Sequence, residues 1–321
     1  MKEGKNERMK VIFDNIIFRL QRTGGISVVW KELLSRARAD AAMQCVELDY
    51  QQALQPRFME RYRIPDYRAD GEAIFHSSYF RILPQEGVHN VTTVHDLTYH
   101  FYRRGLAKAV HLWEEERAIR HSEAVICVSE NTKRDLLRCY PWVKEENVHV
   151  VYNGVGDAFY PMKSVEKKGY LLFIGNSQVA YKRFDVAQEV ARRTGLELRT
   201  ATNVTLEELN TLYNEALCLL YPSDYEGFGI PIIEAQKAGC PVIAQHSSSI
   251  PEVIGEGGFM VAHDTTARMA EEMADIVRQL QSRPNKAIIE AGLENAKRFS
   301  WDKTYAQTKQ VYENIYHHHH L

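Results

Sequence analysis

Strand-like and helix-like segments alternate along most of this 321-residue chain. Apolar runs at 91–94, 124–128 and 217–221 are each followed by a stretch with helical spacing. Strands that alternate with helices form parallel sheets covered by helices on both faces. A doubly wound sheet of this kind binds ligands beyond the carboxyl ends of its strands. The chain is therefore predicted to be an α/β protein whose functional residues follow its strands.

The chain is too long for one small core. A polar segment without periodicity at 156–168, which contains Pro161, interrupts the alternation near the middle. We predict an N-terminal domain over 1–157, a C-terminal domain over 158–302 and a last helix over 303–321. Two sheets of this type would place two ligand-binding edges on either side of a central cleft.

The composition excludes several classes of protein. With 45% hydrophobic and 26% charged residues the chain is not a disordered one, and a net charge of −2 argues against a protein that coats nucleic acid. The sequence contains no run of about 18 apolar residues, so no transmembrane helix is predicted. The opening residues are polar and lack the apolar core of a signal peptide. We therefore expect a cytoplasmic protein.

The cysteines and the histidine run are given no role at this stage. The five cysteines form no C-x-x-C pair and are odd in number, so we expect them to be reduced, with no structural metal. The run His317–His320 is either a tag remnant or a native tail that could bind a metal adventitiously.

The sharpest chemical signal follows the apolar run 217–221 and leads into a predicted helix at Pro231. Its glycines permit a close approach of the backbone to a ligand, and a helix N-terminus favours a phosphate. Two carboxylates here would repel a diphosphate unless they accept hydrogen bonds from hydroxyls or face a developing cation. A sugar nucleotide supplies both. The string is Glu226-Gly227-Phe228-Gly229-Ile230-Pro231-Ile232-Ile233-Glu234.

This string, with residues 235–243 after it, resembles the E-x7-E signature of retaining glycosyltransferases of family 4. Members of that family have two Rossmann-like domains in the arrangement called GT-B. Weaker similarities occur at 151–155 and 249–253. The helix from Ser300 to Tyr316 resembles the family's last helix, which crosses back onto the N-terminal domain.

The resemblance implies retention of anomeric configuration with no cofactor and no required metal. It implies that Glu234 holds the ribose hydroxyls and that Glu226 contacts the donor sugar. The loop backbone would then meet the sugar hydroxyls and the diphosphate, through Gly227, Phe228, Gly229 and Ile230.

A second element follows the predicted strand 170–174. A diphosphate needs a cation, and Lys182 matches the family's phosphate-binding lysine. Asn176 stands where the family often has an arginine, so one positive charge is missing. Arg183 is a possible substitute, although adjacent helical positions point in different directions.

Two elements of the N-terminal half complete the candidate site. Gly24 and Gly25 lie between a strand and a helix and resemble the family's flexible glycine loop. His95 follows the strand 91–94 and resembles the histidine that the family places at the donor sugar. Asp96 is expected to orient the loop.

Two basic segments with aromatic neighbours, 57–63 and 102–104, favour either a solvated surface or a grip on an anionic acceptor at a membrane face. We predict a glycosyltransferase that moves a hexose from a GDP- or UDP-sugar to a glycan or lipid-linked acceptor in polysaccharide biosynthesis. The alternatives are a non-catalytic nucleotide-sugar binder, which Asn176 favours, and a sugar-nucleotide epimerase or phosphorylase of the same fold.

Overall fold

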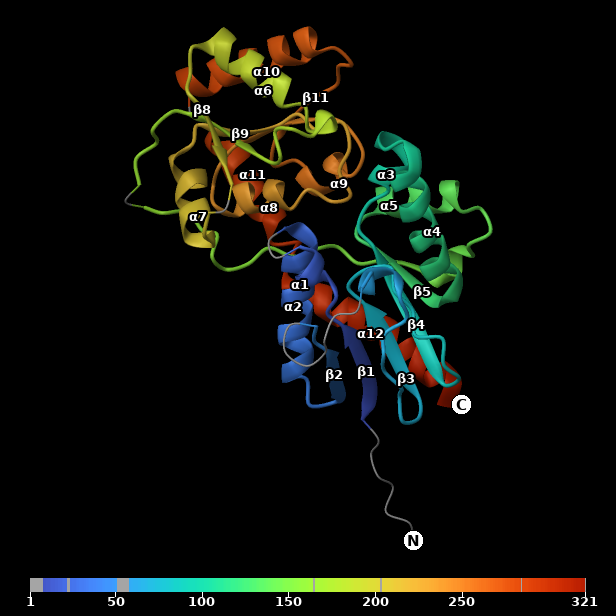
Figure 1. Cartoon of the computed structure of the whole chain (residues 1–321). Helices are drawn as coiled ribbons and strands as arrows, with labels where there is room; N and C mark the ends of the chain where they lie inside the picture. Colours follow the sequence, from blue (N-terminus) through green and yellow to red (C-terminus); the bar gives the residue numbers. More distant parts are fainter. Residues whose placement is uncertain are drawn as a thin grey trace. The chain divides into compact units, whose positions relative to one another are not determined.

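The computed structural model describes residues 8–21, 24–50, 58–163, 165–202, 204–283 and 285–320. The chain divides into two compact units (Figure 1). Unit 1 is Met1–Tyr152 with Trp301–Leu321, and unit 2 is Asn153–Ser300. The division thus falls before the predicted boundary at 157/158, because the segment after Tyr152 packs on unit 2. There the backbone N–H groups of Tyr160 and Met162 donate to the side chains of Asn210 and Asn214.

Unit 1 is built on a six-stranded parallel sheet in the order β2-β1-β3-β4-β5-β6. The sequence analysis assigned no strand to 73–77, which is central in this order. His76 interrupts the apolar run there, yet its imidazole is buried and hydrogen-bonded in the structure. The strands are β1 Met9–Asp14, β2 Met43–Leu48, β3 Ala73–Ser77, β4 Val88–Val94, β5 Ser122–Cys127 and β6 Val148–Val150.

Helices cover both faces of this sheet. Ser129, a residue type preferred at this position, caps α5, since its hydroxyl accepts a hydrogen bond from the backbone N–H of Thr132. The helices of unit 1 are α1 Ile17–Leu20, α2 Gly25–Ala39, α3 Thr98–Tyr102, α4 Gly105–His121, α5 Glu130–Cys139 and α12 Trp301–His320, with 3₁₀ turns at Glu60–Tyr62 and Glu145–Asn147.

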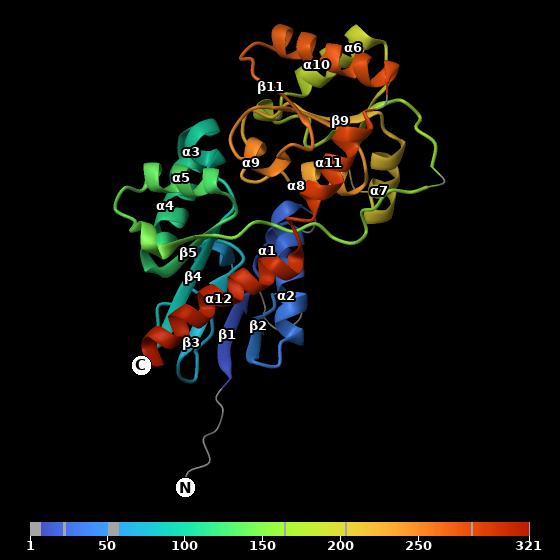
Figure 2. The ribbon, with the colours of Figure 1, turned by 180° about the vertical axis from the view of Figure 1, so that it is seen from behind.

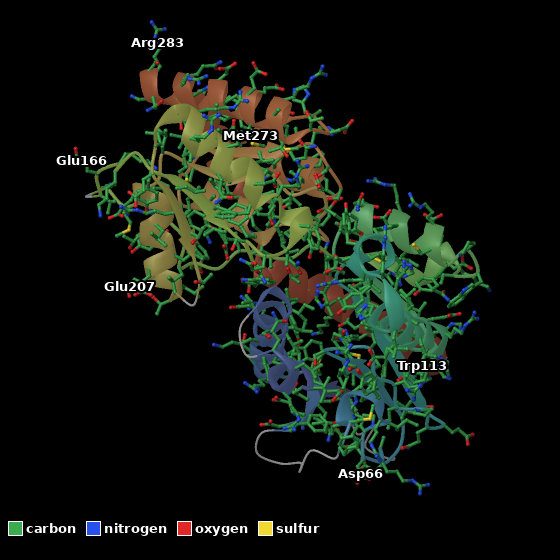
Figure 3. All side chains as sticks on the ribbon, turned by 45° about the horizontal axis from the view of Figure 1, so that its top comes forward. Asp66, Trp113, Glu166, Glu207, Met273 and Arg283 are labelled. Atoms are coloured by element: carbon green, nitrogen blue, oxygen red, sulfur yellow. The ribbon has the colours of Figure 1, made fainter. Side chains whose placement is uncertain are left out.

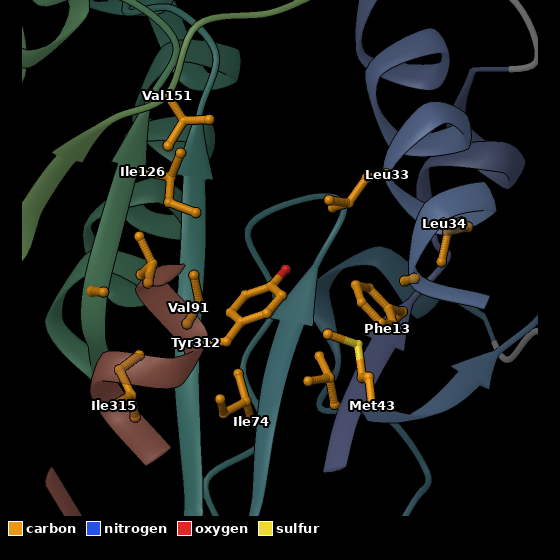
Figure 4. Close-up of a cluster of buried hydrophobic side chains, with 14 of the residues drawn as sticks. Phe13, Leu33, Leu34, Met43, Ile74, Val91, Ile126, Val151, Tyr312 and Ile315 are labelled. Atoms are coloured by element: carbon orange, nitrogen blue, oxygen red, sulfur yellow. The ribbon is translucent and has the colours of Figure 1, made fainter. Parts of the chain in front are cut away.

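The last helix, α12, completes the core of unit 1 (Figure 2). Tyr312 and Ile315 pack among side chains of the sheet and α2, including Phe13 and Ile74 (Figure 4). The Tyr312 hydroxyl lies 2.5 Å from Nδ1 of His76. Burial lowers the pKa of His76 to about 3, so the ring is neutral.

Unit 2 has a five-stranded parallel sheet in the order β11-β10-β9-β7-β8. The chain steps from β7 outward to β8 and then returns to the other side of β7 as β9. The strand order therefore reverses between β7 and β9, and open α/β sheets bind ligands at such a switch point. The strands are β7 Leu171–Ile174, β8 Leu198–Ala201, β9 Cys218–Tyr221, β10 Val242–Gln245 and β11 Phe259–Val261.

Helices cover the sheet of unit 2 as well. Thr205 and Glu208 form a capping box at the start of α7. Met273 of α10 is buried in the core (Figure 3). The short α9 and β11 were missed because each has few residues. The helices are α6 Phe184–Thr194, α7 Leu206–Glu215, α8 Ile230–Lys237, α9 Ile250–Ile254, α10 Thr266–Ser282 and α11 Lys286–Ala296, with a 3₁₀ turn at Ala180–Lys182.

The two α/β domains with parallel sheets that the sequence predicted are thus confirmed. In the part of the chain that the structure describes, no helix is both long and apolar enough to cross a membrane.

Candidate functional site

The loop between β9 and α8 is held in place by three consecutive serines that follow β10. Ser247 donates to the carbonyl of Ser223 at 2.7 Å, and Ser248 accepts from the backbone N–H of Glu226 at 2.8 Å. The buried Ser249 hydroxyl lies 2.9 Å from the carbonyls of both Glu226 and Phe228. Parallel neighbours β9 and β10 end at the same edge of the sheet. The loop after one strand therefore supports the loop after the other.

The loop passes into α8 through Gly229, which has φ of 103°. This left-handed conformation favours glycine, and a Cβ there would also lie 3.2 Å from Cδ1 of Ile232. Pro231 occupies the first turn of α8, where its missing N–H costs no hydrogen bond. The strand, loop and helix predicted for the E-x7-E string are therefore present.

Lys182 and Glu226 meet at the switch point of unit 2. Lys182 lies beyond β7 and Glu226 beyond β9, and the lysine Nζ is 2.6 and 2.7 Å from the two carboxylate oxygens. The lysine side chain is 20% exposed and the glutamate side chain 10%. Two residues singled out from separate motifs thus form one partly buried ion pair. A ligand that enters here meets both charges.

Glu234 lies one turn beyond the start of α8, and Tyr213 of α7 donates to its Oε2 at 3.0 Å. Burial raises the pKa of Glu234 to about 7, although the Tyr213 hydrogen bond acts in the opposite direction. Burial also raises the pKa of Tyr213 well above its usual range, so the phenol keeps its proton. Tyr213 was not predicted as a site residue from the sequence, because its partner is on another helix.

The structure shows that Arg183 does not stand beside Lys182 as a second cation. Arg183 adopts a left-handed conformation with φ of 52°. Its guanidinium donates to Asp224 and Thr266, each at 3.0 Å. Asn176 is exposed, and its side-chain oxygen accepts from the backbone N–H of Gln178 at 3.0 Å. The missing positive charge at Asn176 is therefore not replaced by Arg183.

The other predicted site residues belong to unit 1. His95 follows β4, and burial lowers its pKa to about 4, although Asp96 acts in the opposite direction. Its imidazole is therefore neutral at physiological pH. Asp96 accepts from the backbone N–H of Thr98 at 2.8 Å and so orients the loop before α3.

Gly24 and Gly25 differ in what they require. Gly24 has φ of 153°, and a Cβ there would collide with the side chain of Gln21 at 1.6 Å. A Cβ on Gly25 would meet nothing within 4 Å. A contact within the protein therefore accounts for a glycine at position 24. At position 25, the first residue of α2, a side chain would meet only open space.

The basic segment 57–63 is only partly a surface feature. Arg57 lies outside the described residues. Arg61 donates to the buried Glu114 at 2.7 and 3.1 Å, and Glu60 is itself buried against Arg81. Arg61 is therefore committed to an internal ion pair. In contrast, the whole of 102–104 is exposed.

Comparison with known proteins matches the chain to two family models. The model described as "Glycosyl transferases group 1" matches residues 142–279, and that of "Glycosyltransferase Family 4" matches residues 69–159. The O-antigen chain mannosyltransferase B of Escherichia coli is 26% identical over 317 residues, which cover 81% of this chain and 81% of that protein. The alpha-maltose-1-phosphate synthase of Mycolicibacterium smegmatis is 26% identical over 286 residues, which cover 71% and 74%.

Among solved structures, the sucrose-phosphate synthase of Thermosynechococcus elongatus has a TM-score of 0.71 at 15% identity. The match covers 96% of this chain and 99% of that one. This similarity establishes the two-domain GT-B fold. The chain thus carries, in succession over residues 69–279, the two glycosyltransferase domains that these models describe.

We predict that Ser249→Ala destabilises unit 2 by about 1–3 kcal/mol, the cost of removing the partner of buried polar groups. Urea unfolding measures this loss. Ser282→Ala, at an exposed serine that also donates to a carbonyl, is the matched control and should be close to neutral. Equal effects of the two substitutions would show that the serine contacts do not hold the loop.

We predict that a nucleotide sugar binds more tightly as the pH rises from 6 to 8, because the Glu234 carboxylate, with a pKa of about 7, is the form that accepts hydrogen bonds from hydroxyls. The folded pKa lies above the ordinary value of 4.5, so the contribution of Glu234 to stability falls as the pH rises from about 4.5 to about 7 and levels off above that. Calorimetric titration and thermal unfolding at each pH measure both trends. Glu234→Gln should abolish them, and trends that persist in this variant would exclude Glu234 as their source.

Proposed function

We propose that this glycosyltransferase moves a hexose from a GDP- or UDP-sugar to a glycan or lipid-linked acceptor in polysaccharide assembly. We propose retention of configuration and no requirement for a metal. The observation that carries the proposal is the ion pair of Lys182 and Glu226 at the switch point of unit 2, with the partly buried Glu234 on the helix that follows the same loop. The relative from Escherichia coli, named for O-antigen mannosyl transfer, supports the polysaccharide context.

In this proposal the donor binds to unit 2. Lys182 supplies positive charge to the diphosphate, and the N–H groups of Gly227, Phe228, Gly229 and Ile230 supply hydrogen bonds at the helix N-terminus. Glu234 accepts from the ribose hydroxyls. Glu226 already neutralises Lys182 in the free protein, so it keeps the lysine extended toward the ligand. It then accepts from hydroxyls of the donor sugar.

The reaction breaks the bond between the anomeric carbon and the diphosphate oxygen and forms one to the acceptor hydroxyl oxygen on the same face. The departing diphosphate takes the hydroxyl proton. Preorganised N–H groups and Lys182 stabilise the charge that develops on the leaving group. His95, neutral because of burial, hydrogen-bonds a donor-sugar hydroxyl without adding a positive charge near the oxocarbenium-like carbon.

The decisive experiment separates binding from turnover. A panel of GDP- and UDP-sugars is screened by thermal shift, since a ligand at about 100 times its Kd adds about 2.7 kcal/mol of stability. We predict that Glu234→Ala weakens nucleotide binding by about 10- to 100-fold, as expected for hydrogen bonds to a charged group. Glu226→Ala should lower kcat by about 10²- to 10³-fold. It should leave nucleotide affinity unchanged or tighter, because Lys182 is released.

The control for both variants is Glu207→Ala, at an exposed glutamate of α7 (Figure 3), which should change neither quantity. Equal losses of affinity and rate in Glu226→Ala would contradict its assigned role. Binding without turnover across acceptors would establish the non-catalytic binder that Asn176 favours. Conversion of the donor without an acceptor would establish an epimerase.

We also propose that unit 1 contacts an anionic membrane surface when the acceptor is lipid-linked. Leu106 and Trp113 lie two turns apart on α4, and they are 80% and 52% exposed. Figure 3 labels Trp113. Trp113 shares a shallow hollow with Arg63 and Arg117. Exposed apolar side chains beside arginines suit the interface of anionic lipids.

Vesicle co-sedimentation tests this contact. We predict binding to vesicles that contain phosphatidylglycerol and weaker binding to purely zwitterionic ones. Trp113→Ala should reduce the bound fraction, and Tyr160→Ala, at a similarly exposed aromatic residue of unit 2, should not. Equal binding to both lipid compositions would refute the proposal.

A further inference from the structure

Two histidines and a glutamate from three separate elements meet at the amino-terminal edge of the unit 1 sheet. His89 is the second residue of β4, Glu123 the second residue of β5, and His319 lies in the last turn of α12. The His89 Nδ1 contacts one oxygen of Glu123, and the His319 Nε2 lies 2.8 Å from the other. The two imidazole rings stack with centroids 3.8 Å apart. One carboxylate therefore bridges two imidazoles.

A register shift between β4 and β5 places the Glu123 carboxylate in this cluster. Asn90 pairs with Ser122 and Val91 with Ala124, so Glu123 is an extra residue in β5. Ala124 and Val91 belong to the core cluster beneath α12. Strict alternation would turn Glu123 to the opposite face of the sheet, away from His89. A β-bulge re-aims a side chain, and here it places Glu123 beside His89.

The helical spacing of α12 places His319 on the side of the helix that faces the sheet. Tyr312 and Ile315 are buried against the sheet, and His319 follows them at helical spacing. His319 is thus positioned as the continuation of the packed stripe, and its side chain keeps 34% of its surface exposed. His317 is two residues earlier, on a different side of the helix, and has no part in the cluster.

We propose that His89, Glu123 and His319 bind a divalent transition-metal ion of the zinc class, which fastens the end of α12 to the sheet. One ligand atom from each residue lies within 4.8 Å of the others. Atoms bound to one tetrahedral zinc are roughly 3.4 Å apart, so a small rotation of the exposed His319 completes the set. Imidazole nitrogens with one carboxylate oxygen suit zinc and leave a fourth position for water.

The proposed ion has a structural role and is independent of the proposed glycosyl transfer. His89 and His95 lie at opposite ends of β4, about 20 Å apart at the rise of a strand. The metal therefore does not touch the donor. It cross-links the chain's last helix to strands β4 and β5 and stabilises unit 1. Of the histidine run, only His319 belongs to the proposed site.

The test is calorimetric titration of zinc into the full chain, with thermal unfolding of the same samples. Wild type should bind one ion with a raised Tm. His319→Ala and Glu123→Gln should each weaken zinc binding at least about tenfold, a loss on the scale known for altered metal-site shells. His317→Ala is the matched control, because it removes a histidine from the same run without touching the cluster, and it should bind as wild type does.

Two outcomes would overturn the proposal. If His317→Ala weakens binding as much as His319→Ala, the histidine run binds zinc by itself and the ion is adventitious. If Glu123→Gln, folded as shown by its Tm without zinc, binds as tightly as wild type, the bulge residue is not a ligand. Neither readout involves donor binding or turnover, so failure of the proposed function would leave this test unaffected.

Discussion

The candidate site depends on the hydrogen bonds by which the loop after β10 fixes the loop after β9. The Ser248 hydroxyl accepts a hydrogen bond from the N–H of Glu226, and the Ser249 hydroxyl donates to the carbonyls on either side of Gly227, those of Glu226 and Phe228. Ser248 itself has a positive φ of 47°, a conformation that costs free energy and persists only where the surroundings determine it. The backbone that leads to the helix N-terminus is therefore ordered before any ligand arrives, and little entropy remains to be lost on binding.

The candidate site in unit 2 contains several charged groups, and burying Glu234 costs the free protein stability. Glu234 has a pKa of about 7 because burial opposes its ionisation, and only one hydrogen bond, from Tyr213, compensates. Lys182 and Glu226 satisfy each other. A hydroxyl-rich, doubly anionic ligand would supply donors to Glu234 and a second anion to Lys182. In the proposed complex, Glu234, whose burial opposes its ionisation in the free protein, would gain hydrogen-bond donors from the ligand.

The sequence predicted the α/β class, the two parallel sheets and the loop at Glu226, because apolar runs and glycines are local signals. It could not identify the three supporting serines or Tyr213, since their contacts join residues that are about 20 positions apart or more. It also left open whether Arg183 adds charge beside Lys182, and the left-handed backbone at Arg183 decides against this. Ala73–Ser77 was missed because its apolar run is short and is interrupted by His76, whose burial depends on a contact with Tyr312 of the distant α12.

At Trp301 the chain returns to unit 1 as α12, and this helix has contacts that lead to both ends of β4. Tyr312 of α12 contacts His76, whose other nitrogen lies 2.8 Å from the Thr93 hydroxyl, two residues before His95. About two turns further along α12, His319 reaches the pair formed by His89 and Glu123. The helix is thus attached to β4 near both of its ends. Because packed elements move together rather than deform, fixing the last turn of α12 also restricts the strand that presents His95.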